Sequence, residues 1–364
     1  MKVLYVDLER EWRGGQSQAL LTLCGLRVRG HDAHLLAAGG CPLAERAETA
    51  GVPVHLVRTG SRRIATVHLL RQLLKKHKYD LIHANEPHAL TSSWLARSHR
   101  RVPVVTSRRV AYPLGKGLLS RKRYENVDRV LAISRFVARS VLDSGIPGEK
   151  IAIVYEGVEI PSLVSPETRQ SARKRWGVSE GEILFGSVGY LLPEKGQEIV
   201  VRALPSVRAN FPNVRLVLAG DGPCRPQLEG LVREQELQDS AIFAGFVNDV
   251  SQVYAALDAF VFPSLAEPLG TSLLAAMAWG LPVIAAASGG VPEYVENGIT
   301  GLLVSPPDQR LFSIGMLRLL SEPGLATRLG SAARGAIQQR FTADRMVDCT
   351  LQVYEDVLRK RRKT

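Results

Sequence analysis

The stretch that decides the fold spans residues 266–283 and reads Ala266-Glu267-Pro268-Leu269-Gly270-Thr271-Ser272-Leu273-Leu274-Ala275-Ala276-Met277-Ala278-Trp279-Gly280-Leu281-Pro282-Val283. No charged residue occurs between Glu267 and Glu293, and a membrane span needs about twenty apolar residues. Glycines and prolines interrupt this segment, however, at seven positions, namely Pro268, Gly270, Gly280, Pro282, Gly289, Gly290 and Pro292. We therefore interpret it as a loop, a short helix over 271–279, a Gly-Leu-Pro turn and a buried strand over 283–286.

Short apolar runs that alternate with helical patterns extend this interpretation to both sides. In the first half the predicted strands are Lys2–Val6, Ala33–Ala37, Val54–Val57, Leu81–His83, Val104–Ser107 and Val130–Ile133. In the second half they are Leu184–Val188, Arg215–Ala219, Ala241–Phe243, Ala259–Phe262, Val283–Ala286 and Gly301–Val304. Strands that alternate with helices predict parallel sheets covered by helices on both faces. The sequence therefore predicts an α/β protein with two such units.

Domain boundaries follow from composition and length. Pro and Ser cluster near residues 161–166, and 364 residues suit two domains of ordinary size. We predict an N-terminal domain over 1–165, a C-terminal domain over 166–341 and a long closing helix over 342–364.

The net charge of +12 is concentrated in the first half of the chain. Residues 1–165 hold 26 basic and 14 acidic side chains, whereas the remainder holds 21 of each. An excess of this kind favours a polyanionic partner, namely nucleic acid, an anionic membrane surface or a phosphorylated substrate. The four cysteines contain no Cys-x-x-Cys pair, which excludes a disulfide framework and suits a reducing compartment. We expect a cytoplasmic protein without a signal peptide.

Two glycine-rich loops are candidate phosphate sites. Gly14 and Gly15 follow the first predicted strand, where backbone N–H groups at a helix start can approach a phosphate. Gly189 and Lys195 lie in a loop at the carboxyl end of a strand in the second half, and ligands of open α/β sheets bind at that edge. Each loop alone is weak evidence for a site, because most such turns and lysines belong to ordinary surfaces.

Taken with these loops, the stretch at 266–283 resembles the donor-binding signature of family-four retaining glycosyltransferases. The similarity continues through Ser288-Gly289-Gly290-Val291-Pro292-Glu293, Gly220-Asp221-Gly222-Pro223 and Asp80-Leu81-Ile82-His83-Ala84-Asn85-Glu86-Pro87. The resemblance implies the GT-B fold, which has two Rossmann-like lobes, an interdomain cleft and a C-terminal helix that crosses back to the N-terminal lobe.

The resemblance also implies the site residues. Glu267 would contact the donor sugar, Lys195 the diphosphate, and Asn85 and His83 would lie near the acceptor hydroxyl as the other catalytic candidates. The implied donor-binding residues are Gly14, Gly15, Gly189, Tyr190, Lys195, Phe246, Glu267, Leu269, Gly270, Thr271, Ser272 and Ala275. Arg13, Arg108 and Arg109 are the acceptor-side candidates.

Three positions depart from the family pattern. Ala275 stands where the family has a second glutamate that holds the ribose, and Tyr190 replaces an arginine that accompanies the lysine on the diphosphate. Asn85 replaces the second histidine of a His-x-His segment. These departures leave the nucleotide and the level of activity open.

We expect a retaining, hexosyl-type glycosyltransferase that takes a nucleotide-sugar donor and relies on front-face attack assisted by the leaving group. Without an Asp-x-Asp motif the sequence predicts a metal-independent enzyme with no cofactor. A basic first half suits a lipid-linked or lipopolysaccharide-type acceptor at an anionic membrane surface, where the protein would bind peripherally. One alternative is a catalytically weak GT-B protein that serves as a binding subunit. A nucleic-acid-binding protein is disfavoured by the absence of a recognisable groove-reading motif and by 6% aromatic residues.

Overall fold

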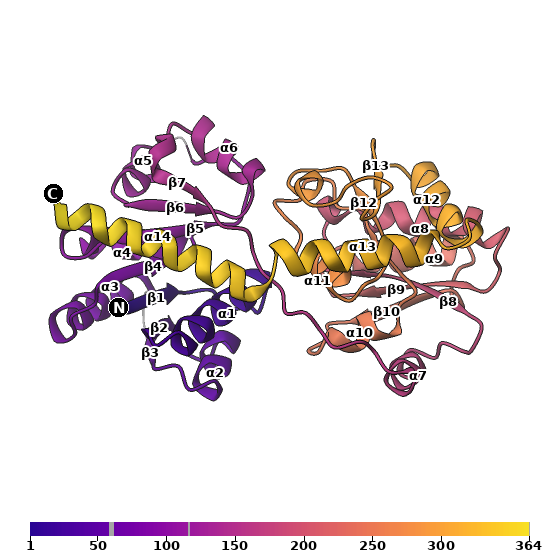
Figure 1. The fold of residues 1–364 in the computed structure, drawn as a ribbon, viewed down its shortest axis with the longest axis horizontal. Helices are drawn as coiled ribbons and strands as arrows, with labels where there is room; N and C mark the ends of the chain where they lie inside the picture. Colours follow the sequence, from indigo (N-terminus) through magenta and orange to yellow (C-terminus); the bar gives the residue numbers. More distant parts are fainter. Residues whose placement is uncertain (58–61, 116, 364) are drawn as a thin grey trace. The chain divides into compact units, whose positions relative to one another are not determined.

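The computed structural model describes residues 1–57, 62–115 and 117–363, which form two compact units (Figure 1). The first unit comprises Met1–Gly157 together with Ala343–Thr364, and the second comprises Val158–Thr342. Each unit is an α/β domain with its own sheet and its own core. The prediction of two Rossmann-like units in an α/β protein is confirmed.

The first unit is built on a seven-stranded parallel sheet with the order β3-β2-β1-β4-β5-β6-β7. Its strands are β1 (Lys2–Asp7), β2 (Asp32–Ala38), β3 (Val54–Val57), β4 (Leu81–Ala84), β5 (Val104–Arg108), β6 (Arg129–Ala132) and β7 (Ile151–Ile153). The central strands β1, β4 and β5 are buried along nearly their whole length because helices cover both faces of a parallel sheet. They are mostly apolar, but Asp7, His83 and Arg108 are buried among them. β7 is the one strand of this sheet that the sequence analysis missed, since only three residues at the sheet edge belong to it.

Two layers of helices cover this sheet. The helices are α1 (Gly14–Val28), α2 (Pro42–Thr49), α3 (Arg62–Lys76), α4 (Pro87–Leu95), α5 (Leu118–Glu125), α6 (Arg135–Asp143) and α14 (Ala343–Lys363), with short 3-10 turns η1 (Ser98–Arg100) and η2 (Gly148–Lys150). One core joins the sheet to α1, α2 and α14, and a second core joins the opposite face to α3, α4, α5 and α6.

Helix α14 returns the end of the chain to the first unit, as the resemblance implied (Figure 1). It packs directly against α1, where a Cβ added at Gly25 would lie 2.5 Å from the Cγ2 atom of Val347. At the same contact the Arg29 guanidinium donates to the carboxylates of Asp344 and Asp348, at 2.9 and 2.7 Å. The close approach of these two helices therefore depends on a residue without a side chain.

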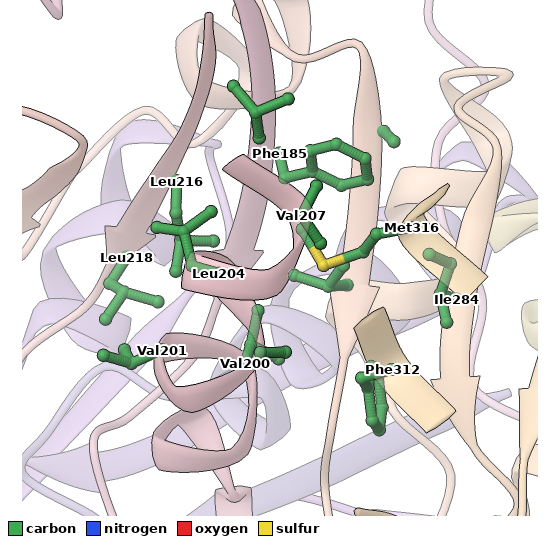
Figure 2. Close-up of a cluster of buried hydrophobic side chains, with 14 of the residues drawn as sticks. Phe185, Val200, Val201, Leu204, Val207, Leu216, Leu218, Ile284, Phe312 and Met316 are labelled. Carbon is green, nitrogen blue, oxygen red and sulfur yellow. The ribbon is translucent and has the colours of Figure 1, made fainter. Parts of the chain in front are cut away.

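The second unit is built on a six-stranded parallel sheet with the order β10-β9-β8-β11-β12-β13. Its strands are β8 (Ile183–Val188), β9 (Val214–Ala219), β10 (Ala241–Gly245), β11 (Ala259–Phe262), β12 (Val283–Ala286) and β13 (Leu302–Val304). Its helices are α7 (Pro166–Arg175), α8 (Gln197–Arg208), α9 (Arg225–Glu234), α10 (Ser251–Ala256), α11 (Thr271–Ala278), α12 (Gln309–Ser321) and α13 (Leu325–Arg340), with 3-10 turns η3 (Pro193–Lys195) and η4 (Val291–Glu293). Figure 2 shows a hydrophobic core of this unit, in which side chains of α8 such as Leu204 pack with Phe185 of β8 and Met316 of α12.

The chain passes into the second unit after Gly157, whereas the sequence analysis placed this boundary after residue 165. The backbone N–H of Val158 donates to the carbonyl of Phe341 at 2.9 Å, and Val158 and Thr342 form a parallel bridge. The two crossings between the units therefore lie side by side, and the Pro- and Ser-containing segment at 161–166 lies inside the second unit rather than between the units.

Candidate active site

An ion pair lies at the carboxyl edge of the second sheet. Lys195, at the end of η3, donates from Nζ to Oε2 of Glu267, at 2.7 Å. Glu267 follows β11 and is only 5% exposed, while 28% of the Lys195 side chain reaches solvent. The structure thus joins two predicted catalytic side chains that stand far apart in sequence.

The loop that carries Glu267 is fixed through its backbone. Gly290 donates its N–H to the Glu267 carbonyl at 2.9 Å, and the Tyr294 hydroxyl donates to the carbonyl of Leu269 at 2.6 Å. Gly270 takes a left-handed φ of 99°, and a Cβ there would lie 3.0 Å from the Tyr294 hydroxyl. This position therefore requires glycine.

Helix α11 begins directly after this loop. Thr271 and Ser272 form its first turn and are half-buried. The first N–H groups of a helix have no partner within it and carry partial positive charge, so they favour an anion. Ala275 is half-buried one turn further on and offers no side-chain hydrogen bond. The Gly270–Ser272 backbone is therefore the part of the predicted donor site that suits a phosphate.

The other donor residues predicted in the second unit occupy neighbouring loops at the same edge, whereas Gly14 and Gly15 begin α1 in the first unit. Gly189 follows β8, and its carbonyl oxygen would lie 1.9 Å from a Cβ at Gly220, so these two loops touch through bare backbone. Tyr190 and Phe246 follow β8 and β10 and are 44% and 61% exposed. Exposed rings of this kind can stack on a planar ligand group. Leu269 is fully buried and anchors the loop rather than lining it.

In the first unit, Asn85 is the centre of a buried hydrogen-bond network at the carboxyl edge. Its Oδ1 accepts from the hydroxyl of Tyr5 at 2.8 Å and from Nη1 of Arg109 at 2.7 Å. Its Nδ2 donates to Oδ2 of Asp7 at 2.6 Å and to the Gly15 carbonyl at 3.4 Å. All four hydrogen-bonding positions of this amide are therefore in use. Asn85 thus ties the Gly14–Gly15 turn to β1 and β5.

The three predicted acceptor-side arginines have different surroundings. Arg109 pairs with Glu156 at 2.8 Å, and its Cδ would lie 3.3 Å from a Cβ at Gly15. Arg13 forms an exposed pair with Glu11 at 2.5 Å. Arg108 is 3% exposed and turns into the face covered by α5. The structure therefore places only Arg109 in the Asn85 network.

His83 lies on β4 and faces the return helix. Its Nδ1 meets the hydroxyl of Tyr354 at 2.5 Å and its Nε2 meets Oγ of Ser107 at 2.7 Å. Burial lowers the pKa of His83 well below its usual value, and Arg109 adds to this effect. A buried neutral ring with both nitrogens engaged holds α14 to the sheet, so its position does not favour the catalytic role that we expected for it.

Sequence reasoning missed three acidic residues at this edge. Asp7 ends β1 and is fully buried, and burial raises the pKa of its carboxyl group. Glu156 is the buried partner of Arg109. Glu86 caps α4 by accepting from the N–H groups of His88 and Ala89, and burial raises its pKa to about 7. Each lies at or just after the carboxyl end of a strand of the first sheet, and this position is the sequence signal that could have identified them.

Two features that bear on membranes and metals are absent from the described residues. None of their helices combines the length and the apolar character that crossing a bilayer requires. No group of three or more His, Cys, Asp or Glu side chains within the described ranges is arranged to hold a metal ion.

Both units match known protein families. Residues 12–160 match the family described as Glycosyltransferase Family 4, and residues 168–336 match the family described as Glycosyl transferases group 1. An uncharacterized glycosyltransferase of Methanocaldococcus jannaschii is 30% identical over 62% of this chain, which spans 60% of that protein. A GDP-mannose-dependent alpha-(1-6)-phosphatidylinositol monomannoside mannosyltransferase of Mycolicibacterium smegmatis is 26% identical over 88% of this chain and 90% of its own length.

A solved structure has the same architecture over almost the whole chain. Alr3699/HepE of Anabaena, in complex with UDP and glucose, superposes with a TM-score of 0.85 and 26% identity. The alignment covers 98% of this chain and 99% of the Anabaena chain.

Proposed function

We propose that this chain, which is a glycosyltransferase with the GT-B fold, moves a sugar from a nucleotide-sugar donor to a hydroxyl acceptor with retention of the anomeric configuration. The observation that carries the proposal is the Lys195–Glu267 pair beside the first turn of α11. A cation and helix N–H groups are suited to a diphosphate, and a carboxylate is suited to sugar hydroxyls. The UDP and glucose bound to the Anabaena protein support a donor of this class.

Each group has a distinct part in the proposed reaction. Lys195 and the N–H groups of Thr271 and Ser272 stabilise the negative charge that develops on the departing diphosphate. Glu267 orients the donor sugar through its hydroxyls. The acceptor hydroxyl then attacks from the face that the diphosphate leaves, and the diphosphate oxygen takes its proton. This route needs neither a protein nucleophile nor a metal ion.

A thermal-shift screen followed by a transfer assay tests this proposal. Nucleoside diphosphates and nucleotide sugars are screened first, and the binders are then offered as radiolabelled donors to membrane extract. We expect nucleotides of one class to raise the thermal stability of the protein. The sugar of the corresponding donor should then appear on an acceptor from the extract, and an α-linked donor should give an α-linked product. Binding without transfer from any donor favours the second candidate function, a GT-B binding subunit. Saturation of the Asn85 amide and the presence of Ala275 are the observations that favour it.

We further propose a cell-envelope acceptor, lipid-linked or of the lipopolysaccharide type, reached at an anionic membrane surface. The +12 net charge and the exposed basic side chains of α3 and α5, among them Arg71, Lys75 and Arg121, support this location. The phosphatidylinositol mannoside named for the Mycolicibacterium relative is an anionic lipid acceptor and supports it too. Each basic residue near such a surface contributes about 1 kcal/mol. We expect the protein to sediment with anionic vesicles and added salt to release it. Equal binding to neutral vesicles would contradict the proposal.

A further inference from the structure

Arg108 is a buried cation without an acidic partner. It ends β5 and is 3% exposed, and no Asp or Glu of the described residues forms an ion pair with it. Its Nη2 donates to the carbonyl of Tyr112 at 2.5 Å, and its Nη1 reaches the hydroxyl of Tyr124 at 3.5 Å. Its Nε has no hydrogen-bond partner in the described part of the chain. A buried charge left in this state is costly, and an anion bound beside it would offset that cost.

A second arginine, which is half-buried, contacts the same tyrosine and also lacks an acidic partner among the described residues. Arg123, on α5, places its guanidinium 5.6 Å from the ring centre of Tyr124, the residue that Arg108 also contacts. Arg123 donates to the hydroxyl oxygens of Thr91 and Ser120, at 2.5 and 3.4 Å. Its Nε is also buried without a partner among the described residues, and no described carboxylate pairs with it. Both guanidinium groups therefore contact one buried tyrosine, and their acceptors in the described ranges are neutral, namely three hydroxyl groups and the Tyr112 carbonyl.

Tyr112 covers this cluster. Its ring lies 4.8 Å from the Arg108 guanidinium and is 63% exposed, and its carbonyl is the best acceptor that Arg108 has. Both contacts come from one residue in the irregular segment that follows β5. A carboxylate or phosphate oxygen carries a full negative charge and can accept two parallel N–H bonds from a guanidinium, which a single neutral carbonyl cannot do. A ligand anion can therefore replace the Tyr112 carbonyl with a gain in binding energy.

We propose that Arg108 and Arg123 form a binding site for a phosphate group, which Tyr112 closes in the unliganded chain. The site lies at the carboxyl edge of the first sheet, on the face covered by α4 and α5. The assignment of this phosphate to the acceptor rests on the proposed function. The existence of the phosphate site does not depend on that function. The acceptor is accordingly a phosphorylated molecule, either a soluble phosphate ester or a lipid with a phosphate headgroup.

Titration with glycerol 3-phosphate tests the site directly. The titration uses the full chain carrying Lys195→Ala, so that the second unit does not contribute a competing phosphate site. We expect binding that Arg108→Gln and Arg123→Gln each weaken at least tenfold, because each removes charged hydrogen bonds. Arg121→Gln is the matched control, since this exposed arginine of α5 pairs with Glu125 instead, and it leaves the affinity within twofold. Tyr112→Ala removes the ring that covers Arg108 and keeps the backbone carbonyl at this position, and it tightens binding several-fold.

Vesicles distinguish the two sources of phosphate. If the ligand is a lipid headgroup, phosphatidic acid in phosphatidylcholine vesicles binds the protein, and Arg108→Gln weakens this binding more than Arg121→Gln does. If the ligand is soluble, glycerol 3-phosphate binds and the two variants bind vesicles equally. The proposal is overturned if neither probe binds, or if Arg108→Gln and Arg123→Gln both leave the affinity unchanged. The two arginines would then have only a packing role. Donor binding is measured separately on the native chain, so failure of the phosphate site and failure of the proposed transfer are distinct results.

Discussion

Replacing Lys195 with alanine separates the structural and the chemical contributions of the Lys195–Glu267 pair. Removing one partner of a fully buried ion pair costs about 3–5 kcal/mol because the other charge stays buried. Glu267 is 5% exposed, but 28% of Lys195 reaches water, so we expect a loss of about 1–2 kcal/mol. Arg202→Ala is the matched control, since its pair with Glu198 is 41% exposed on both sides, and it costs about 0.5 kcal/mol or less.

A double-mutant cycle with Glu267→Gln measures this coupling. Urea unfolding of the four proteins gives the free energies, with hydrogen exchange of peptides from the second unit to assign the change. A neutral amide at 267 needs no cation, so Lys195→Ala should then cost almost nothing in the free energy of unfolding. The rate of sugar transfer should also fall on the order of a hundredfold in Lys195→Ala, if the lysine stabilises the leaving diphosphate. Equal cost of Lys195→Ala in both backgrounds would refute the ion-pair account, and unchanged transfer would remove Lys195 from the reaction.

Three further predictions concern the first unit. Gly25→Ala places a methyl group 2.5 Å from Cγ2 of Val347 and should lower the free energy of unfolding by about 1–3 kcal/mol. Adding Val347→Ala to this variant should restore part of the lost stability, and a double variant no more stable than Gly25→Ala would contradict the contact. Tyr354→Phe leaves Nδ1 of His83 buried without its partner and should cost about 1–3 kcal/mol in urea unfolding, whereas a neutral result would mean that water replaces the hydroxyl. Burial raises the pKa of Glu86 from 4.5 to about 7, so the stability that its protonated form contributes is complete below pH 4.5 and is lost as the pH rises towards 7. Glu86→Gln should remove that decline between pH 5 and pH 7, and an identical pH profile of thermal unfolding in the variant would refute the shift.

The sequence predicted the strands well because short, mostly apolar runs alternate with longer helical patterns in a parallel α/β protein. Val54–Val57, Ala259–Phe262 and Val283–Ala286 have the predicted bounds. The closing helix was also predicted closely, at 342–364 against Ala343–Lys363. β7 was missed because a three-residue edge strand has no periodicity to detect.

The site was predicted as a set of residues but not as a set of contacts. The position of a residue in a loop at the carboxyl edge predicts where its Cα atom lies. It does not predict which other residues its side chain contacts. His83 pairs in register with Tyr5 on the neighbouring strand and faces α14, which no spacing within residues 80–87 could show. The saturated amide of Asn85 likewise depends on Asp7, the last residue of β1, and on Arg109, directly after β5.

The return of α14 to the first unit has a consequence for biosynthesis. The second unit is one continuous segment, Val158–Thr342, whereas the first unit needs Ala343 and the residues after it. Met346, Val347 and Tyr354 belong to the core between the sheet and α1. A ribosome therefore releases all of the second unit before the first unit can close its core, and domains fold as units during synthesis. The N-terminal half of the protein is accordingly the last to mature, and a nonsense codon near residue 343 damages the half that was translated first.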